Sequence, residues 1–292
     1  MKEKYMIDVS IIFVNYKTKD LTINAIKSVF EKTQGIDFEI FVVDNNSQDG
    51  SIEAIEKEFS QINIIKNTTN AGFGAANNIA IKQAKGKYIL CLNTDTLLTN
   101  NAIKTMYDFM EKEDNKNIAV CGGTLYDENS NYIMSYANFP NLFNSLSFSW
   151  ILKRLFPMIR NKKEPTDIKE VDFITGADIF FRKTVLDEVG LFDEKFFMYS
   201  EETDLCYRIK KAGYNIKIIP AAKIIHLEEK SSKNFWQNSR MRIKSKYIYA
   251  RKHQNVIEIY LMKISYIIIH LIGYLFSFNK NHIYNIKEHI KG

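Results

Sequence analysis

Five acidic residues in this chain have the type and spacing needed for catalysis or for holding a cation. Asp44 and Asp95 each follow an apolar run, and Glu201, Glu202 and Asp204 crowd together after an aromatic run. Carboxylates bind hard cations such as Mg²⁺ together with phosphate oxygens, and a partly buried carboxylate can act as a general base. These residues predict phosphate chemistry with acid–base assistance.

Asp44 and Asp95 are expected at one edge of a parallel sheet, because each closes a predicted strand. Ligands of open α/β sheets bind at the carboxyl ends of the strands. Asp95 could either bind a metal or cap the next helix, and Thr99 or Asn100 could serve as that cap instead. Asp44 could contact a ribose or a base, or it could hold an Asx-turn over residues 45–47.

The cluster Glu201, Glu202 and Asp204 opens a predicted helix, where the helix dipole favours acids. Glu201 and Asp204 share one helix face, and Glu202 points about 100° away. The preceding aromatic run, residues 196–199, suggests a partly buried site in which one carboxylate is a general base. The alternative is a solvated helix cap.

Two further features accompany these acids. Residues 70–78, NAGFGAANN, place Gly72 and Gly74 at the start of a helix, where backbone can approach a phosphate or an amide edge. The third glycine of a dinucleotide fingerprint is replaced by Asn77, so that fingerprint is absent. His226 ends an apolar segment; it is either a structural histidine or the partner of a carboxylate around Mn²⁺ or Mg²⁺.

Strands and helices alternate in the first half of the chain. Strands are expected at residues 9–15, 38–44, 62–66, 87–92 and 118–121, with helices at 19–32, up to 59, up to 85 and over 101–113. This alternation predicts an α/β fold with a parallel sheet and right-handed crossovers. Residues 124–136 are expected to form an edge hairpin and residues 137–169 a flap over the site.

The second half is expected to complete the same domain. An apolar run over residues 171–182 precedes helices at 183–188 and 200–213, and strands are predicted at 215–219 and 222–226. We place the boundary of this domain at residue 230. The three cysteines are far apart in sequence and the first residues lack a signal-peptide pattern, so we expect a cytoplasmic protein.

Residues 231–292 are expected to form a basic and apolar helical extension. The chain carries a net charge of +6, and residues 230–263 hold nine Lys and Arg against the single acid Glu258. The apolar run 264–278 spans about 22 Å as a helix, short of a bilayer core. We expect it to lie on an anionic membrane surface; packing on the domain, a homodimer contact and nucleic-acid binding are the alternatives.

The order of these segments resembles family 2 glycosyltransferases of the GT-A fold, particularly the bacterial rhamnosyltransferase-like branch. The resemblance runs from about residue 9 to residue 232. Its blocks are SIIFVNY (10–16), VVDNNSQDGS (42–51), NAGFGAANN (70–78), LNTDT (92–96), TGA (175–177), GLFDE (190–194), EETDL (201–205), KAGY (211–214) and His226.

The resemblance implies an inverting transfer of a sugar from a nucleotide-diphosphate donor, dTDP-L-rhamnose or a UDP-sugar, to a hydroxyl of a glycan or a polyprenyl-diphosphate-linked acceptor. It places such an enzyme at the cytoplasmic face of the inner membrane, in surface polysaccharide synthesis. The fold implied is a mostly parallel central sheet flanked by helices, with the C-terminal helical extension added.

The resemblance also implies roles for individual residues. Asp95, the last residue of a DxD-like motif, and His226 would bind Mg²⁺ or Mn²⁺, and Glu202 would be the base, with Glu201 and Asp204 as alternatives. Thr175, Gly176, Ala177 and Asp178 would line the sugar or acceptor region. The donor would be bound by Asn15, Asp44, Asn45, Gly72, Phe73, Asn77, Asn93 and Thr94.

Two rivals differ from this function in their products. A sugar-phosphate nucleotidyltransferase also uses a sheet-edge acid and Mg²⁺, but it needs a glycine-rich loop after the first strand, where this chain has Tyr16-Lys17-Thr18-Lys19. An inactive nucleotide-sugar or glycan-binding module would bind donor without turnover. The intact acids at positions 95, 202 and 204 argue against that module.

Overall fold

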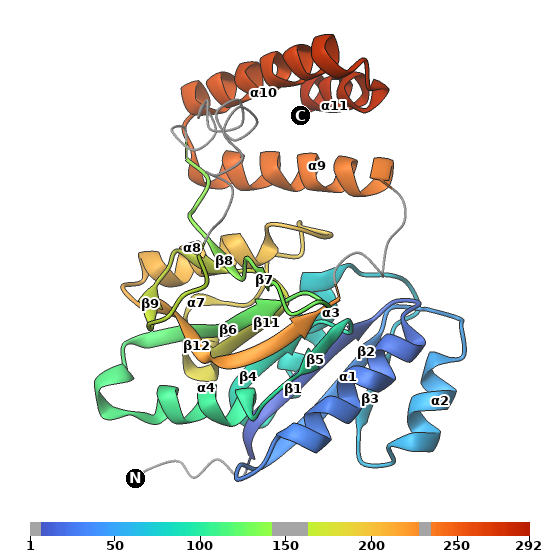
Figure 1. The fold of residues 1–292 in the computed structure, drawn as a ribbon, viewed down its shortest axis with the longest axis vertical. Helices are drawn as coiled ribbons and strands as arrows, with labels where there is room; N and C mark the ends of the chain where they lie inside the picture. The colour runs from blue at the N-terminus through green and yellow to red at the C-terminus, as the bar shows by residue number, and fades with distance from the viewer. Residues whose placement is uncertain (1–6, 142–162, 228–234) are drawn as a thin grey trace.

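A computed structural model describes residues 7–141, 163–227 and 235–292 of this chain. Its centre is a 10-stranded sheet whose main path runs β3-β2-β1-β4-β11-β6-β12-β5 (Figure 1). Three helices, α9 to α11, stand on one side of this sheet domain. The predicted domain boundary at residue 230 and most of the predicted flap lie outside the described residues, so both stay predictions.

The N-terminal half of the sheet is parallel, as the alternating pattern predicts. Strands β1 (Ile7–Asn15), β2 (Phe38–Asp44), β3 (Asn63–Lys66) and β4 (Gly86–Leu92) are joined through α1 (Lys19–Lys32), α2 (Ser51–Glu58) and α3 (Phe73–Ile81). In β1, Ile11 and Phe13 pack toward α1 and Ile12 packs toward α3. Both faces are covered, which is why these strands are apolar throughout.

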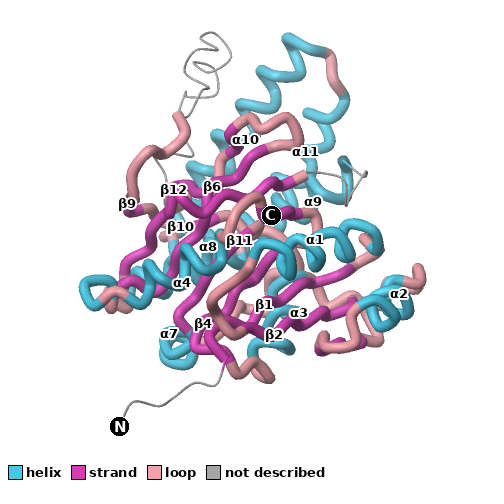
Figure 2. The backbone as a smooth tube through the Cα atoms, turned by 60° about the horizontal axis from the view of Figure 1, so that its bottom comes forward, coloured by secondary structure: helices cyan, strands magenta, loops and turns pink. Residues whose placement is uncertain are grey.

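The C-terminal half is mixed, because it adds antiparallel strands to the parallel pairs of the predicted sheet. Strand β11 (Asp178–Arg182) runs antiparallel between β4 and β6 (Ile118–Tyr126). The short strand β5 (Thr96–Leu98), which the sequence pattern did not predict, pairs antiparallel with β12 (Asn215–His226). Figure 2 shows these strands as one continuous sheet with helices on both faces.

The two strands predicted over residues 215–226 form one long strand, β12. It pairs parallel with β6, and its register shifts between Ile219 and Lys223. Pro220 lies inside this irregularity, and proline cannot donate a backbone hydrogen bond to a neighbouring strand. The strand continues past the proline and delivers His226 to the edge where β5 begins.

Smaller elements complete the sheet domain. The predicted hairpin is confirmed, since β6 pairs antiparallel with β7 (Tyr132–Ile133). The other elements are α4 (Ala102–Glu111), the 3₁₀ turn Glu113–Asn115, β8 (Tyr136–Ala137), β9 (Lys169–Glu170), β10 (Phe173–Ile174), α7 (Lys183–Val189) and α8 (Glu201–Lys211).

The C-terminal extension is helical, as predicted, but its apolar helix is longer than expected. Helix α9 (Phe235–His253) is followed by α10 (Val256–Ser277) and α11 (Lys280–Lys291). A capping box between Asn255 and Glu258 starts α10 well before residue 264. At about 1.5 Å per residue its 22 residues span about 33 Å. Length and composition alone would therefore allow this helix to cross a bilayer, although core helices of soluble proteins also meet these two criteria.

Candidate active site

The first part of the site lies where β1 and β2 end side by side. Asn15 Nδ2 donates to Asp44 Oδ1 at 2.7 Å and to Ser47 Oγ at 3.0 Å. Ser47 N donates to the other carboxylate oxygen, Asp44 Oδ2, at 3.0 Å. This is the Asx-turn that the sequence offered as an alternative. It leaves lone pairs on the carboxylate, so the turn holds Asp44 in place and does not preclude a ligand contact.

A chain of hydroxyl groups connects this corner to the end of β4. Asn15 Oδ1 accepts from Thr18 Oγ1 at 2.9 Å and from Thr22 Oγ1 at 2.8 Å. Thr18 Oγ1 also lies 3.1 Å from Thr94 Oγ1, the neighbour of Asp95. Thr18 and Thr22 were not among the predicted site residues; their only signal was their place just after the first strand and in the first turns of α1.

The structure brings Asp95 and His226 together, although they are far apart in sequence. Asp95 Oδ1 lies 3.2 Å from His226 Nε2, and Asn93 Nδ2 lies 3.4 Å from the same nitrogen. The pairing of β5 with β12, which aligns His226 with Thr96, and a hydrogen bond from Leu227 N to Asp95 O fix this approach.

The donor set at this corner fits a divalent cation that phosphate oxygens also bind. Two neighbouring ligands of an octahedral ion with bonds of about 2.1 Å lie about 3.0 Å apart, close to the observed separation of Asp95 Oδ1 and His226 Nε2. Within the described ranges, no group of three or more His, Cys, Asp or Glu residues forms a complete metal cage. The remaining ligands would therefore have to come from substrate and water.

The glycine loop packs directly against the segment that leads to the acidic helix α8. Phe73 N donates to Phe197 O at 2.9 Å. A Cβ atom on Gly72, whose φ is +85°, would lie 2.1 Å from the same oxygen, so only glycine fits there. Asn45 Nδ2 donates to Gly72 O at 3.2 Å and Asn77 Nδ2 to Phe73 O at 3.0 Å, which ties the loop to the end of β2 and to its own helix.

Glu201 and Glu202 differ in how far they are buried. Glu201 is 3% exposed and its Oε2 has no partner among the described residues. Burial, with the charge of Glu202, raises the pKa of Glu201 well above its usual value. Glu202 is half-buried, accepts from Thr203 Oγ1 at 3.1 Å, and has a pKa raised mainly by burial. Glu202 is therefore the more accessible carboxylate of the two.

Tyr199 and Ser200, which precede this pair, have φ of +69° and +67°. Non-glycine residues in the left-handed region cost about 1–3 kcal/mol each and tend to occur at functional sites. Ser200 is the residue before α8, and its side chain makes no capping hydrogen bond. The left-handed pair turns the chain sharply into α8 and sets the direction of the two glutamates.

The segment Thr175-Gly176-Ala177 lies next to the end of β4. Ala177 O accepts from Asn93 N at 2.9 Å, and Gly176 lies against the Phe73 ring. Asp178 differs from this segment, because it is fully buried and its Oδ2 accepts from Gly123 N at 2.5 Å. Burial raises the pKa of Asp178 well above its usual value, despite that hydrogen bond. This placement points to a structural group and not to the predicted sugar contact.

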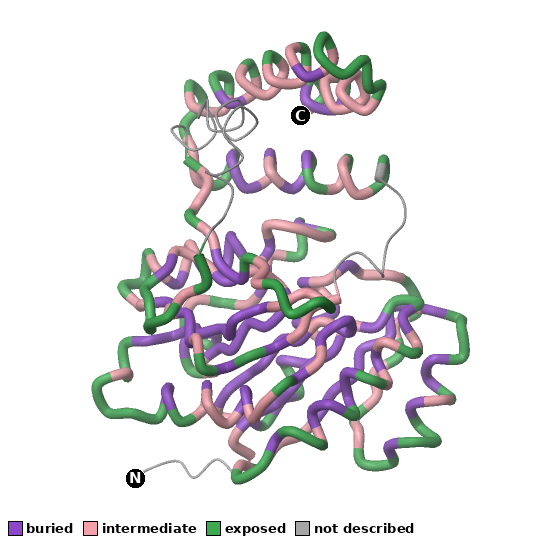
Figure 3. The backbone as a smooth tube through the Cα atoms, in the orientation of Figure 1, coloured by how far each residue is buried: buried purple, intermediate pink, exposed green. Residues whose placement is uncertain are grey.

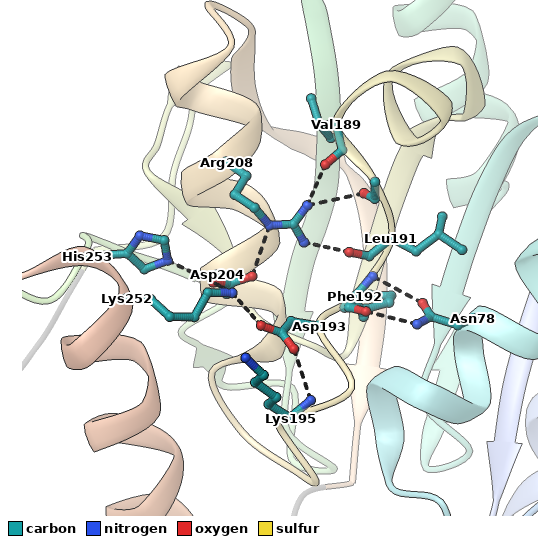
Figure 4. Close-up of polar contacts among 11 residues, drawn as sticks. Asn78, Val189, Leu191, Phe192, Asp193, Lys195, Asp204, Arg208, Lys252 and His253 are labelled. Atoms are coloured by element: carbon teal, nitrogen blue, oxygen red, sulfur yellow. Dashed lines mark hydrogen bonds and ion pairs between the residues drawn. The ribbon is translucent and has the colours of Figure 1, made fainter.

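Asp204 faces the C-terminal extension and not the donor corner. Its Oδ1 lies 2.6 Å from Lys252 Nζ and 2.7 Å from His253 Nε2, and its Oδ2 accepts from Arg208 Nε at 3.0 Å (Figure 4). Burial alone would raise the pKa of Asp204, but these hydrogen bonds outweigh it and hold the pKa below its usual value. Both oxygens are occupied, so the structure gives Asp204 the role of an anchor for α9. The sequence pattern gave no sign of this tie.

The comparison with known proteins decides the family. The family model described as "Glycosyl transferase family 2" matches residues 10–190, more than half of the chain and the part that builds the donor corner. The chain belongs to glycosyltransferase family 2. The predicted resemblance is thereby confirmed, and so is the fold, because the structural neighbours of this family 2 glycosyltransferase are GT-A enzymes.

Curated relatives of this glycosyltransferase include hexosyl- and rhamnosyltransferases. It is 26% identical over 232 residues to the low-salt glycan biosynthesis hexosyltransferase Agl10 of Haloferax volcanii, covering 75% of this chain and 67% of the relative. It is 28% identical over 195 residues to the rhamnosyltransferase WbbL of Escherichia coli, covering 62% and 71%. For the N-acetylglucosaminyl-diphospho-decaprenol L-rhamnosyltransferase of Mycobacterium tuberculosis, the identity is 23% and the coverage 64% and 66%. The matches thus span about two thirds of each relative.

Two solved structures share the fold of the glycosyltransferase at low sequence identity. GalNAc-T7 with UDP, GalNAc and Mn²⁺ aligns with a TM-score of 0.61 at 15% identity, covering 85% of this chain and 48% of that chain. Staphylococcus aureus TarS 1-349 aligns with a TM-score of 0.54 at 16% identity, covering 88% and 69%. At this identity the likeness concerns the fold alone.

Proposed function

We propose that this family 2 glycosyltransferase transfers a sugar, with inversion, from a nucleotide-diphosphate donor to a hydroxyl group of a glycan or polyprenyl-diphosphate-linked acceptor in bacterial surface polysaccharide synthesis. dTDP-L-rhamnose is the first candidate donor and UDP-sugars are the second. The rhamnosyl- and hexosyltransferase names of the relatives support this choice. The observation that carries the proposal is the approach of Asp95 to His226 at the carboxyl end of β4.

Donor recognition is assigned to the corner where β1, β2 and β4 end. Asp44 and Asn15 are fixed by their hydrogen bonds and would meet the nucleoside, supported by Asn45. Gly72, Phe73 and Asn77 are assigned to the donor from the first turns of α3, where the helix end favours phosphate; the N–H groups of Gly72 and Phe73 donate to Asn70 Oδ1 and Phe197 O, so these two residues position the loop. Asn93 and Thr94 complete the donor side, and Thr175 to Ala177 face the transferred sugar from the adjoining loop.

Asp95 and His226 would hold Mg²⁺ or Mn²⁺ at this corner. When bound, that cation neutralises the negative charge that develops on the leaving diphosphate. Asn93 Nδ2 lies 3.4 Å from the same His226 nitrogen that faces Asp95; that nitrogen has a single lone pair, which it would give to the cation and not to Asn93.

Glu202 is assigned as the base of the transfer. It would accept the proton of the acceptor hydroxyl while the oxygen forms a bond to the anomeric carbon. The bond from that carbon to the phosphate oxygen breaks, and the nucleoside diphosphate leaves with the electron pair. One direct displacement inverts the anomeric centre. A raised pKa brings the basicity of Glu202 nearer to neutral pH, where a general base is most effective. Glu201, more deeply buried, would stay protonated beside it.

A donor panel separates this function from its rivals. Incubation with dTDP-rhamnose or UDP-sugars and Mn²⁺ or Mg²⁺ should release dTDP or UDP, and both Asp95→Ala and Glu202→Gln should reduce that release. Release of pyrophosphate would indicate a nucleotidyltransferase. Donor binding without turnover on any acceptor would indicate an inactive binding module. Near wild-type turnover in either variant would refute the role given to that residue.

An apolar stripe on α10 supports attachment to a membrane surface. Within α10 only Met262 and Gly273 are buried, and Figure 3 shows the rest of the helix as exposed or intermediate. Six of its exposed apolar side chains recur at spacings of three and four residues, so these six form one face. They are Ile257, Leu261, Ile264, Ile268, Leu271 and Leu275. We assign this face to an anionic membrane, because basic residues of α9 precede it.

The membrane assignment is tested with vesicles. The wild-type chain should sediment with phosphatidylglycerol vesicles, and Ile264→Glu with Ile268→Glu should abolish this. Met134→Glu, which changes an exposed apolar residue of the sheet domain, is the matched control. A homodimer that dissociates in the double variant, without vesicle binding by the wild type, would assign the stripe to a second subunit.

A further inference from the structure

A cavity lies between α9 and the loop that leads into the acidic helix α8. Its volume is about 290 Å³, and its walls include Lys195 and Phe197 from the loop and Arg240, Met241, Lys244 and Ser245 from α9. In Figure 1, α9 stands between the sheet domain and α10, so the cavity is on the side of the molecule that carries the apolar stripe. None of the residues assigned to the donor or to catalysis lines it.

We infer that this cavity binds the phosphate group of a lipid-linked acceptor; the inference rests on the proposed function. Three cations line it, and among the described residues no acidic side chain does. Neither Lys195 Nζ nor Lys244 Nζ has an ion pair with another described residue, and Arg240 lies 3.5 Å from Glu288 with most of its side chain exposed. Two lysines without an ion pair, together with the exposed Arg240, place three positive charges in the lining of one cavity, which attracts a multiply charged anion.

The apolar part of the wall selects among anions. Phe197 is 40% exposed and Met241 lies beside it in the cavity lining. A free inorganic anion would gain nothing from these side chains, whereas a phosphate joined to a hydrocarbon chain would cover them. The volume is at the lower end of the roughly 300–1,000 Å³ typical of small-molecule sites, which suits a phosphate head group with the first carbons of its chain.

Direct hydrogen bonds connect the cavity wall to the segment that precedes Glu201 and Glu202. Ser245 Oγ, in the cavity wall, donates to Met198 O at 2.7 Å. The neighbouring Phe197 O accepts from Phe73 N of the glycine loop. Glu202 follows Phe197 by five positions, so the chain spans at most about 18 Å between them. A phosphate in the cavity could therefore belong to the molecule whose hydroxyl meets Glu202.

The test compares the double variant Lys195→Gln/Lys244→Gln with Lys57→Gln/Lys112→Gln. The control removes the same charge from two exposed lysines of the sheet domain that have no ion pair among the described residues. Binding of geranyl diphosphate to the full chain is measured by calorimetry with the donor site saturated by UDP, then by dTDP. We expect at least tenfold weaker binding in the cavity variant, unchanged binding in the control, and unchanged affinity for UDP and dTDP in both.

The other outcomes overturn the inference. Geranyl diphosphate that does not bind, that UDP and dTDP displace, or that binds equally well to the cavity variant would show that the cavity does not hold it. If inorganic diphosphate bound as tightly as geranyl diphosphate, the apolar side chains of the cavity would have no role in binding. Weaker sedimentation with phosphatidylglycerol vesicles, without any change in geranyl diphosphate binding, would assign the lysines to bulk lipid. Donor turnover is measured separately, so a failure of the proposed function is distinguishable from a failure of this site.

Discussion

His253 Nε2 and Asp204 Oδ1 lie 2.7 Å apart, although 49 positions separate them in the sequence. Asp204 is fully buried in the helix that opens with Glu201 and Glu202, and His253 closes α9. This contact fastens the C-terminal extension to the helix that carries the proposed base.

Asp204→Ala should destabilise the protein by about 1.5–3 kcal/mol, because it removes charge-assisted hydrogen bonds to Arg208, Lys252 and His253, although Lys252 keeps Asp193 and Arg208 keeps backbone carbonyl partners. Denaturant unfolding measures the loss, and proteolysis should cleave α9 to α11 more readily. Asp108→Asn removes an acid from an exposed ion pair with Lys104 and should change stability by less than about 0.5 kcal/mol. Equal effects of the two substitutions would contradict the anchoring role.

Asp95→Ala should lower kcat/KM by about 10³-fold, because charge stabilisation of a leaving group is usually the largest catalytic term. EDTA should abolish wild-type turnover and Mn²⁺ should restore it, whereas Mn²⁺ should not restore the variant. His226→Ala should lose less, about 10–100-fold. The measurement is release of UDP or dTDP. A wild-type enzyme that is unaffected by EDTA would exclude the metal.

The rate should rise with pH through the pKa of Glu202. The base must be ionised, and burial moves its pKa above the ordinary 4.5, so the acidic limb of kcat/KM should lie above that pH. Glu202→Gln should lose about 10²–10⁴-fold and should lack this limb. Glu201→Gln mimics a protonated Glu201 and should stay within a few-fold of wild type. A reversed order of these two losses would make Glu201 the base.

Asp178→Asn should stabilise the protein increasingly as pH rises. The folded-state pKa of Asp178 is raised, so the contribution of this group to stability is greatest below pH 3.8 and is lost as pH rises from there through the raised pKa. Asparagine keeps an oxygen for Gly123 N and carries no charge. The advantage of the variant should grow by up to about 1.4 kcal/mol per pH unit over that interval. Unfolding at several pH values measures it, and a constant difference would contradict a buried ionisable carboxyl group.

Gly72→Ala should lower stability by about 2–5 kcal/mol and raise KM for the donor, because its Cβ would collide with Phe197 O. Gly50→Ala is the control: Gly50 also has a positive φ, +76°, but no atom lies within 4 Å of its added Cβ. It should cost only about 1–2 kcal/mol. Unfolding and donor titration compare them, and equal losses would show that the close approach to Phe197 is unimportant.

Local patterns in the sequence were sufficient to predict most of the helices and strands and most of the residues in the donor corner. Apolar periodicity located the strands ending at Asn15 and Asp44, and these ends meet because neighbouring parallel strands must align their carboxyl edges. Strand β5 escaped prediction because three residues hold too little pattern, and its partner strand begins more than a hundred residues later. The antiparallel direction of β11 likewise was not predicted, because a long connection precedes this strand and no local pattern encodes the direction in which it joins the sheet.

The sequence by itself determined which residues can carry charge, turn the chain or fill the core, and these identities implied the family and the candidate acids. Only the tertiary structure decided what each acid does. Asp95 lies beside His226, Asp178 is buried and accepts a hydrogen bond from Gly123 of β6, and Asp204 is paired with Lys252 and His253. The physical reason is that burial and the distance to an opposite charge set the behaviour of a carboxylate. Both are fixed by contacts between segments that the chain order keeps apart.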